Sequence, residues 1–156
     1  MANHVAFIRA GIERVYPGKW SPVGGDFGTA IEAGDQGVLV IHPPDGRFIH
    51  FAGGVLTGLT FSEGLVRYVS DQTRQAAFGA MTLSEGEPGY WMLAYGFKFA
   101  ASWFDPSSPS APQLVMDMLA FVPEYVGMQL QEIQPQFGGE GWGVPASWWY
   151  ALMDRY

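Results

Sequence analysis

The sequence predicts an α+β fold, in which helices pack on an antiparallel sheet of five strands. Two observations lead to this prediction: three segments repeat apolar residues at helical spacing, and five others alternate or are rich in β-branched and aromatic residues. The predicted elements follow the order α-βββ-α-ββ-α, with a short helix at the C-terminal end. Because 156 residues suit one domain, we expect a single α+β domain over residues 1–139 and a Trp-rich extension over residues 140–156.

The first predicted element is a helix over residues 3–16. Its apolar stripe consists of Val5, Ile8, Ile12 and Val15, which lie three or four residues apart. Asn3 suits the N-cap position, and Pro17-Gly18 suits the end of a helix. The Gly- and Pro-rich residues 18–25 that follow are expected to form a loop.

Three strands are predicted next, over residues 27–33, 38–42 and 47–51. The turn-forming segments GDQG and PDG separate them, and such short connections favour an antiparallel meander. Three glycines follow the third strand: Gly53, Gly54 and Gly58. Because glycine weakens a strand, we expect a bulge or an irregular connection at this point.

A second helix is predicted over residues 62–75, with Ser62 as its N-cap. Two further strands are predicted over residues 78–83 and 90–100. The last strand is apolar on both faces as far as Lys98, which indicates a central strand or one that is covered on both sides.

The third helix, predicted over residues 114–133, has two apolar seams side by side. The first seam consists of Val115, Leu119, Val122, Val126, Leu130 and Ile133, and the second of Leu114, Met118, Phe121, Tyr125 and Met128. Because a single sheet can cover one seam, the second must meet another element or another chain. Pro123 lacks a backbone N–H, so we expect a kink or a break near residues 121–123.

Residues 145–156 are predicted to form the short C-terminal helix, after the Gly-rich residues 138–143. In water, Trp148 and Trp149 would expose a large apolar area, and a helix of about a dozen residues is not stable alone. We therefore expect the extension to dock on the domain or on a partner subunit. A free arm that captures another protein is the alternative.

Composition and charge exclude several classes of protein. The formal net charge is −7 and the chain has only two lysines, which argues against nucleic acid or an anionic membrane as a partner. The absence of cysteine excludes a disulfide framework, a Cys-ligated zinc and a Cys nucleophile. The sequence shows neither a run of 18 apolar residues nor a signal-peptide pattern. We therefore expect a cytoplasmic protein that binds no membrane.

His42 and His50 are the histidines best placed for a metal or catalytic site. They flank the PDG turn, and with Asp45 they would form a small cluster if the loop has three residues, whereas a two-residue loop would put them on opposite faces. The glycines after the third strand lack the Lys and Ser/Thr of a phosphate loop, and Glu85 and Glu87 lie in a hairpin turn. We expect no enzymatic activity, no catalytic residue, no cofactor and no metal.

The order of elements resembles the type III secretion chaperone-like superfamily, which includes the YbjN-like proteins. The resemblance covers most of residues 3–139, and it is sharpest where the strand of residues 90–99, a Pro/Ser loop and the helix of residues 111–133 lead to the segment FGG. Pro123 and the Trp-rich extension depart from the simplest pattern. Members of this superfamily are usually non-enzymatic and commonly dimeric, and they bind other polypeptides. The resemblance therefore implies a binding or chaperone-like module without a cofactor.

The leading hypothesis is a non-enzymatic, chaperone-like module that binds a protein partner and forms a homodimer. The candidate interaction surface consists of Leu114, Met118, Phe121, Tyr125, Met128, Trp148 and Trp149. Two alternatives stay open: a small-molecule-binding or enzymatic module with a pocket near His42 and His50, and an immunity-type inhibitor that blocks a basic toxin by charge complementarity.

Overall fold

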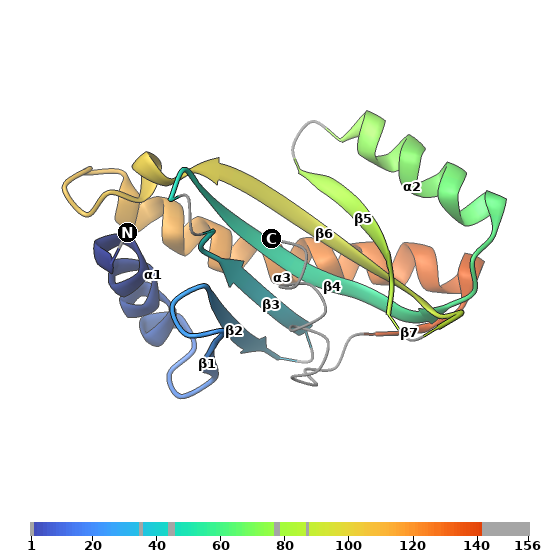
Figure 1. The fold of residues 1–156 in the computed structure, drawn as a ribbon, viewed down its shortest axis with the longest axis horizontal. Coiled ribbons are helices and arrows are strands. Elements are labelled where there is room, and N and C mark those ends of the chain that lie inside the picture. Colours follow the sequence, from blue (N-terminus) through green and yellow to red (C-terminus); the bar gives the residue numbers. More distant parts are fainter. Residues whose placement is uncertain (1, 35, 44–45, 77–78, 87, 142–156) are drawn as a thin grey trace.

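A computed structural model of the chain describes residues 2–34, 36–43, 46–76, 79–86 and 88–141 (Figure 1). The elements in chain order are α1 (Ala2–Val15), β1 (Trp20–Val23), β2 (Gly28–Ala33), β3 (Gln36–Ile41), β4 (Phe48–Leu59), α2 (Glu63–Gln75), β5 (Ala80–Glu85), β6 (Trp91–Ala100), the 3-10 helix η1 (Ala101–Phe104), α3 (Ala111–Phe137) and β7 (Glu140–Gly141). The predicted α+β class is confirmed.

The strands form one antiparallel sheet with the order β1-β2-β3-β4-β6-β5. The short strand β7 pairs with β4 beyond the N-terminal end of β3. The described residues thus contain seven strands rather than the predicted five. The first additional strand, β1, lies where a loop was expected. It is a short edge strand, and its residues Ser21 and Pro22 are exposed and typical of loops. The second, β7, has only two residues and shows no periodicity.

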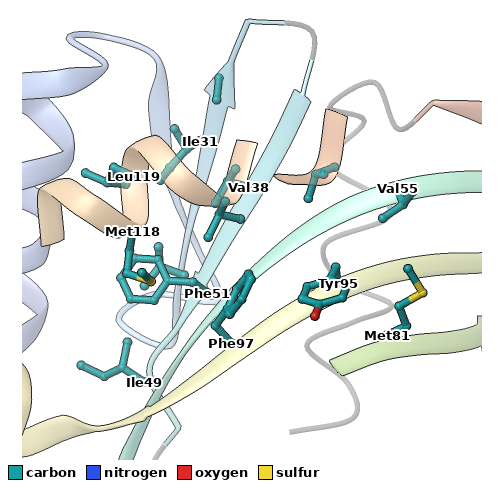
Figure 2. Packing of buried hydrophobic residues seen from close by; sticks show 14 of the residues in the cluster. Ile31, Val38, Ile49, Phe51, Val55, Met81, Tyr95, Phe97, Met118 and Leu119 are labelled. Carbon is teal, nitrogen blue, oxygen red and sulfur yellow. The ribbon is translucent and has the colours of Figure 1, made fainter. Parts of the chain in front are cut away.

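The core lies between one face of the sheet and all three helices. The register places Ile31, Val38, Gly53, Tyr95 and Met81 in one row across five strands. Figure 2 shows Met118 and Leu119 of α3 among the side chains of the same cluster. The helix α1 contributes Ile8 and Ile12 to it, and α2 contributes Leu65 and Val69. We call this side of the sheet the helix face and the other side the second face.

The strand β4 continues through the glycines that were expected to weaken it. Its pairing with β6 shifts register between Gly54 and Leu56 and again between Leu56 and Leu59, so the predicted irregularity is present within the strand rather than after it. A Cβ on Gly53 would overlap Val126 Cγ2, and glycine at this position therefore allows α3 to lie directly on the strand.

The helix α3 runs unbroken from Ala111 to Phe137, with Pro123 and Pro135 inside it. Of the kink or break expected near residues 121–123, the break does not occur. The prediction for α2 is confirmed, including its N-cap, because the Leu65 amide donates a hydrogen bond to Ser62 Oγ at 3.1 Å. The strand β6 lies between β4 and β5, as a central strand should. The C-terminal helix expected over residues 145–156 lies outside the described residues.

No helix of the described residues is both long enough and apolar enough to cross a membrane.

Candidate functional site

The second seam of α3 forms a strip along one side of the helix, beside β6. We call Leu114, Met118, Phe121, Tyr125 and Met128 the α3 flank. Met118 is buried and Leu114 and Tyr125 are half-buried, whereas Phe121 is 39% exposed and Met128 is 60% exposed. The first seam faces the sheet and is buried, apart from a half-buried Leu130. The sheet therefore buries the first seam, apart from Leu130, and covers the second seam only in part.

Aromatic rings of β6 hold the α3 flank in place. The ring of Tyr125 lies 4.6 Å from that of Tyr95, and the ring of Phe121 lies 5.4 Å edge-on from that of Phe97. Phe121 and Tyr125 also contact each other, with ring centroids 5.5 Å apart. Contacts of this kind fix the ring positions beyond what area burial alone achieves. The flank is thus a preorganised apolar surface, and its outward part consists of Phe121 and Met128.

The apolar surface extends from the α3 flank to η1 through Leu114. The exposed ring of Trp103 packs on Phe99 with centroids 5.8 Å apart. Trp103 and Leu114 line a hollow of about 470 Å³, together with Ser102, Ser108, Ser110, Gln113 and Asp117. The exposed position of Trp103 depends on how η1 joins β6 to the loop before α3, which residue spacing alone does not reveal.

The charges on α3 are all negative. Asp117, Glu124 and Glu132 are exposed, and the helix has no Lys, Arg or His. Glu132 accepts a hydrogen bond from the hydroxyl of Tyr68 at 3.1 Å. Burial of the Tyr68 ring, followed by this hydrogen bond to Glu132, raises the pKa of Tyr68 to about 12. The α3 flank is therefore apolar along its length and is accompanied by carboxylates.

The structure places the two candidate histidines on opposite faces of the sheet. His50 pairs with Ile41, and His42 is the next residue, so its side chain points to the helix face while that of His50 points to the second face. His42 is 3% exposed, and a cavity of about 10 Å³ lies beside it, which has room for no more than about one water molecule. A shared pocket with both histidines at its mouth is not present in the described residues.

The other segments considered as sites are explained by the fold. Gly53 lies beneath α3, and Glu85 accepts a hydrogen bond from the Gly89 amide at 3.0 Å within the β5–β6 turn. Glu87, Asp45, Trp148 and Trp149 lie outside the described residues. Within the parts of the chain that the structure describes, no three His, Asp or Glu side chains gather where they could hold a metal ion.

Comparison with known proteins identifies the fold. No family model matches the chain, and a comparison with curated proteins also found no match. Among solved structures, the crystal structure of YbjN from E. coli, a proposed transcription regulator, matches with a TM-score of 0.55 and 8% sequence identity. The match covers 90% of this chain and 96% of YbjN. The predicted resemblance to YbjN is therefore confirmed at the level of the fold.

Proposed function

We propose that this chain is a non-enzymatic, chaperone-like module that binds protein partners through the α3 flank, and that its preferred partner is an amphipathic, basic polypeptide segment. The observation that carries this proposal is the composition of α3, which exposes Phe121 and Met128 beside three carboxylates and no basic residue. Preorganised aromatic and Met side chains are typical of binding surfaces. The fold shared with YbjN, which is described as a proposed transcription regulator, supports a binding role.

The negative charge of this chain favours a positively charged partner. The chain has a formal net charge of −7, and Asp117 and Glu124 are exposed on the same helix as the α3 flank. A partner that presents Lys or Arg around an apolar core gains electrostatic steering, and an acidic partner is repelled. An acidic protein with two lysines is also poorly suited to direct DNA contact. The supported function is therefore protein binding rather than nucleic-acid binding.

The proposal is tested with two labelled peptides that share one amphipathic Leu pattern, one with Lys and the other with Glu at the polar positions. Fluorescence polarisation should show that the Lys peptide binds and the Glu peptide does not. Met128→Gln should weaken binding about tenfold, or about 1.4 kcal/mol, because a buried apolar contact is lost. Met116→Gln is the matched control, since Met116 is 40% exposed on the opposite side of the same helix.

Two results would reject the proposal. One is equal binding of the Lys and Glu peptides, and the other is an equal effect of the Met128 and Met116 substitutions. Raising the ionic strength should weaken binding of the Lys peptide, because salt screens the attraction between exposed charges.

Homodimer formation stays a prediction, with the α3 flank as its interface. A second copy would bring its own Asp117, Glu124 and Glu132 to the contact, so like charges would oppose association. Added salt should therefore strengthen a homodimer while it weakens a complex with a basic segment. Light scattering at micromolar concentration, at low and high salt, distinguishes the two, and monomer mass under both conditions would reject the homodimer.

An immunity-type inhibitor of a basic toxin would use the same acidic and apolar surface, and the net charge of −7 favours it as the second candidate.

We also propose that the protein is cytoplasmic. Fractionation of cells that express the native protein tests this location.

A further inference from the structure

The hollow between η1 and the start of α3 combines an aromatic ring with a negative charge. We call it the Trp103 hollow; its lining consists of Ser102, Trp103, Ser108, Ser110, Gln113, Leu114 and Asp117. Its volume of about 470 Å³ lies within the range of pockets that hold small ligands or long side chains. Among the described residues that line it, Asp117 carries the only charge. The lining therefore favours a ligand group that is positively charged and can also contact an aromatic ring.

Trp103 presents a fixed aromatic ring to this hollow. Its indole packs on Phe99, with ring centroids 5.8 Å apart and ring planes at 44°, and 55% of the residue is nevertheless exposed. Tryptophan is enriched among the residues that contribute most to binding energy at interfaces. Of the aromatic side chains, tryptophan also attracts a cation most strongly to its face. The ring is therefore a suitable surface on which a flat cation can stack.

Asp117 supplies a carboxylate that is held in place and lacks a basic partner. Gln113 Nε2 donates a hydrogen bond to Asp117 Oδ1 at 2.7 Å, which orients the carboxylate from one turn earlier on α3. In the described parts of the chain, no basic side chain forms an ion pair with Asp117. Residues 99–141 include five acidic residues and no Lys, Arg or His. A cation for this carboxylate must therefore come from another molecule.

The N-terminal end of α3 does not turn the hollow into an anion site. A helix carries about half a positive charge at this end, which alone would favour an anion. The full negative charge of Asp117 outweighs it, and the described lining contains no Lys or Arg to hold an anion. The amides of Ala111 and Leu114 already donate to the carbonyls of Ser108 and Ser110, at 3.1 and 3.0 Å. The chemistry therefore favours a cation.

We propose that the Trp103 hollow binds the guanidinium group of an arginine in the basic segment that the α3 flank binds. The inference rests on the function proposed above and specifies the partner of that surface. A guanidinium is planar, so it can stack on Trp103 while its N–H groups donate to the Asp117 carboxylate. A lysine ammonium is more strongly hydrated and has no flat face, so it gains less here. Leu114 belongs to both the hollow and the α3 flank, so one segment can occupy both.

The geometry of α3 sets where the arginine must stand in the partner. Asp117 and Met128 are eleven residues apart, which is about 16 Å along the helix axis. A helical partner that lies along α3 covers the same distance with about eleven residues of its own. An arginine that reaches the hollow is therefore near one end of a segment whose apolar side chains contact Met128.

Three labelled peptides test this position. They are the all-Lys amphipathic peptide and two versions with one Lys→Arg replacement, near the N-terminal or the C-terminal end. Fluorescence polarisation should show that one replacement strengthens binding about fivefold and the other has no effect. Equal gains at both ends, or at neither, would overturn the proposal.

Substitution of Trp103 locates the gain. In Trp103→Leu, the all-Lys peptide and the favoured Arg peptide should bind equally well, because the stacking surface is lost. Phe61→Leu is the matched control: Phe61 is 54% exposed and packs on Trp91, at the opposite end of β6, with centroids 5.1 Å apart. The fivefold gain should persist in Phe61→Leu. A gain that also persists in Trp103→Leu would contradict the arginine site.

A small probe tests the hollow independently of the α3 flank. The chain is labelled with 5-fluorotryptophan, the Trp103 signal is assigned through Trp103→Phe, and N-acetylarginine amide is added at millimolar concentration. The Trp103 fluorine resonance should shift with this probe, less with N-acetyllysine amide, and less in Asp117→Asn. A Trp103 response without peptide binding would reject the function proposed for the α3 flank alone. Peptide binding without a Trp103 response would reject the arginine site alone.

Discussion

The hydroxyl of Tyr16 donates a hydrogen bond to the backbone carbonyl of Leu119 at 2.9 Å. In an unbroken helix, the Leu119 carbonyl would accept from the amide four residues later, but that residue is Pro123, which has no N–H. Tyr16 therefore supplies the donor that the proline removes, from the residue directly after α1. This bond ties the C-terminal end of α1 to α3 at the point where Pro123 interrupts the backbone hydrogen bonds of that helix.

Tyr16→Phe should destabilise the protein by about 1–2 kcal/mol, because the Leu119 carbonyl loses its partner in a partly buried site. Pro123→Ala restores a backbone N–H at that position, so in the Pro123→Ala background the cost of Tyr16→Phe should fall by about 1 kcal/mol. Urea denaturation of the four proteins measures this coupling.

Tyr68→Phe is the control for this cycle, because its hydroxyl also reaches α3 but bonds the exposed Glu132 carboxylate. We expect a cost below about 0.5 kcal/mol for Tyr68→Phe and no coupling to Pro123→Ala. Additive effects of Tyr16→Phe and Pro123→Ala would contradict the role assigned to Tyr16.

Gly53→Ala should destabilise the protein by about 2–3 kcal/mol, because the new Cβ overlaps Val126 Cγ2 and forces α3 away from β4. Val126→Ala in the same chain should recover part of this loss by making room. Gly127→Ala is the matched control on α3, since its nearest neighbouring atom lies at 4.0 Å, and it should add up to about 1 kcal/mol through helix propensity. Thermal denaturation that ranks Gly53→Ala with Gly127→Ala would refute the close packing.

His42 should make stability depend on pH between 6.5 and 4. Burial is the main reason that the pKa of His42 falls to about 4, Arg9 and His4 lower it further, and Asp26 opposes them. Below pH 6.5 the unfolded chain takes up a proton that the folded chain refuses, so stability falls as the pH drops and the loss ends near pH 4. The full penalty is about 3 kcal/mol.

His42→Leu removes this penalty, and it also removes two ring nitrogens that have no hydrogen-bond partner among the described residues. Between pH 7 and pH 5, the parent chain should lose about 2 kcal/mol more than the variant. The carboxylates titrate in both proteins and cancel in the difference. Parallel stability curves for the two proteins would show that His42 is protonated in the folded state.

Local signals in the sequence predicted the elements that do not depend on distant contacts. Ser62 marks the start of α2, because its hydroxyl oxygen accepts a hydrogen bond from the amide three residues later. The apolar residues of α1 keep helical spacing along the whole helix. The strand β1 was missed because Pro22 and its neighbours resemble a loop, and only pairing with β2 makes them a strand. The length of β4 could not be predicted from its own residues. Glycine is needed at position 53 because Val126 of α3 lies directly above it.

The α3 flank was predictable as a seam, but its exposure was not. Helical spacing alone places Leu114, Met118, Phe121, Tyr125 and Met128 on one side. Which of them face solvent is decided by Tyr95 and Phe97 on the preceding strand β6, which cover Tyr125 more than Met128. The separation of His42 from His50 is likewise a consequence of strand register, which the turn sequence left open.

Methyl NMR of methionine tests the central claim, binding at the α3 flank, most directly. The chain has seven methionines, and three report on different surfaces: Met128 on the α3 flank, Met116 on the opposite side of α3, and Met92 on the second face. On titration with the Lys-containing amphipathic peptide, we predict that the Met128 ε-methyl resonance shifts while those of Met116 and Met92 do not. A shift of Met116 or Met92 with no change at Met128 would contradict the claim.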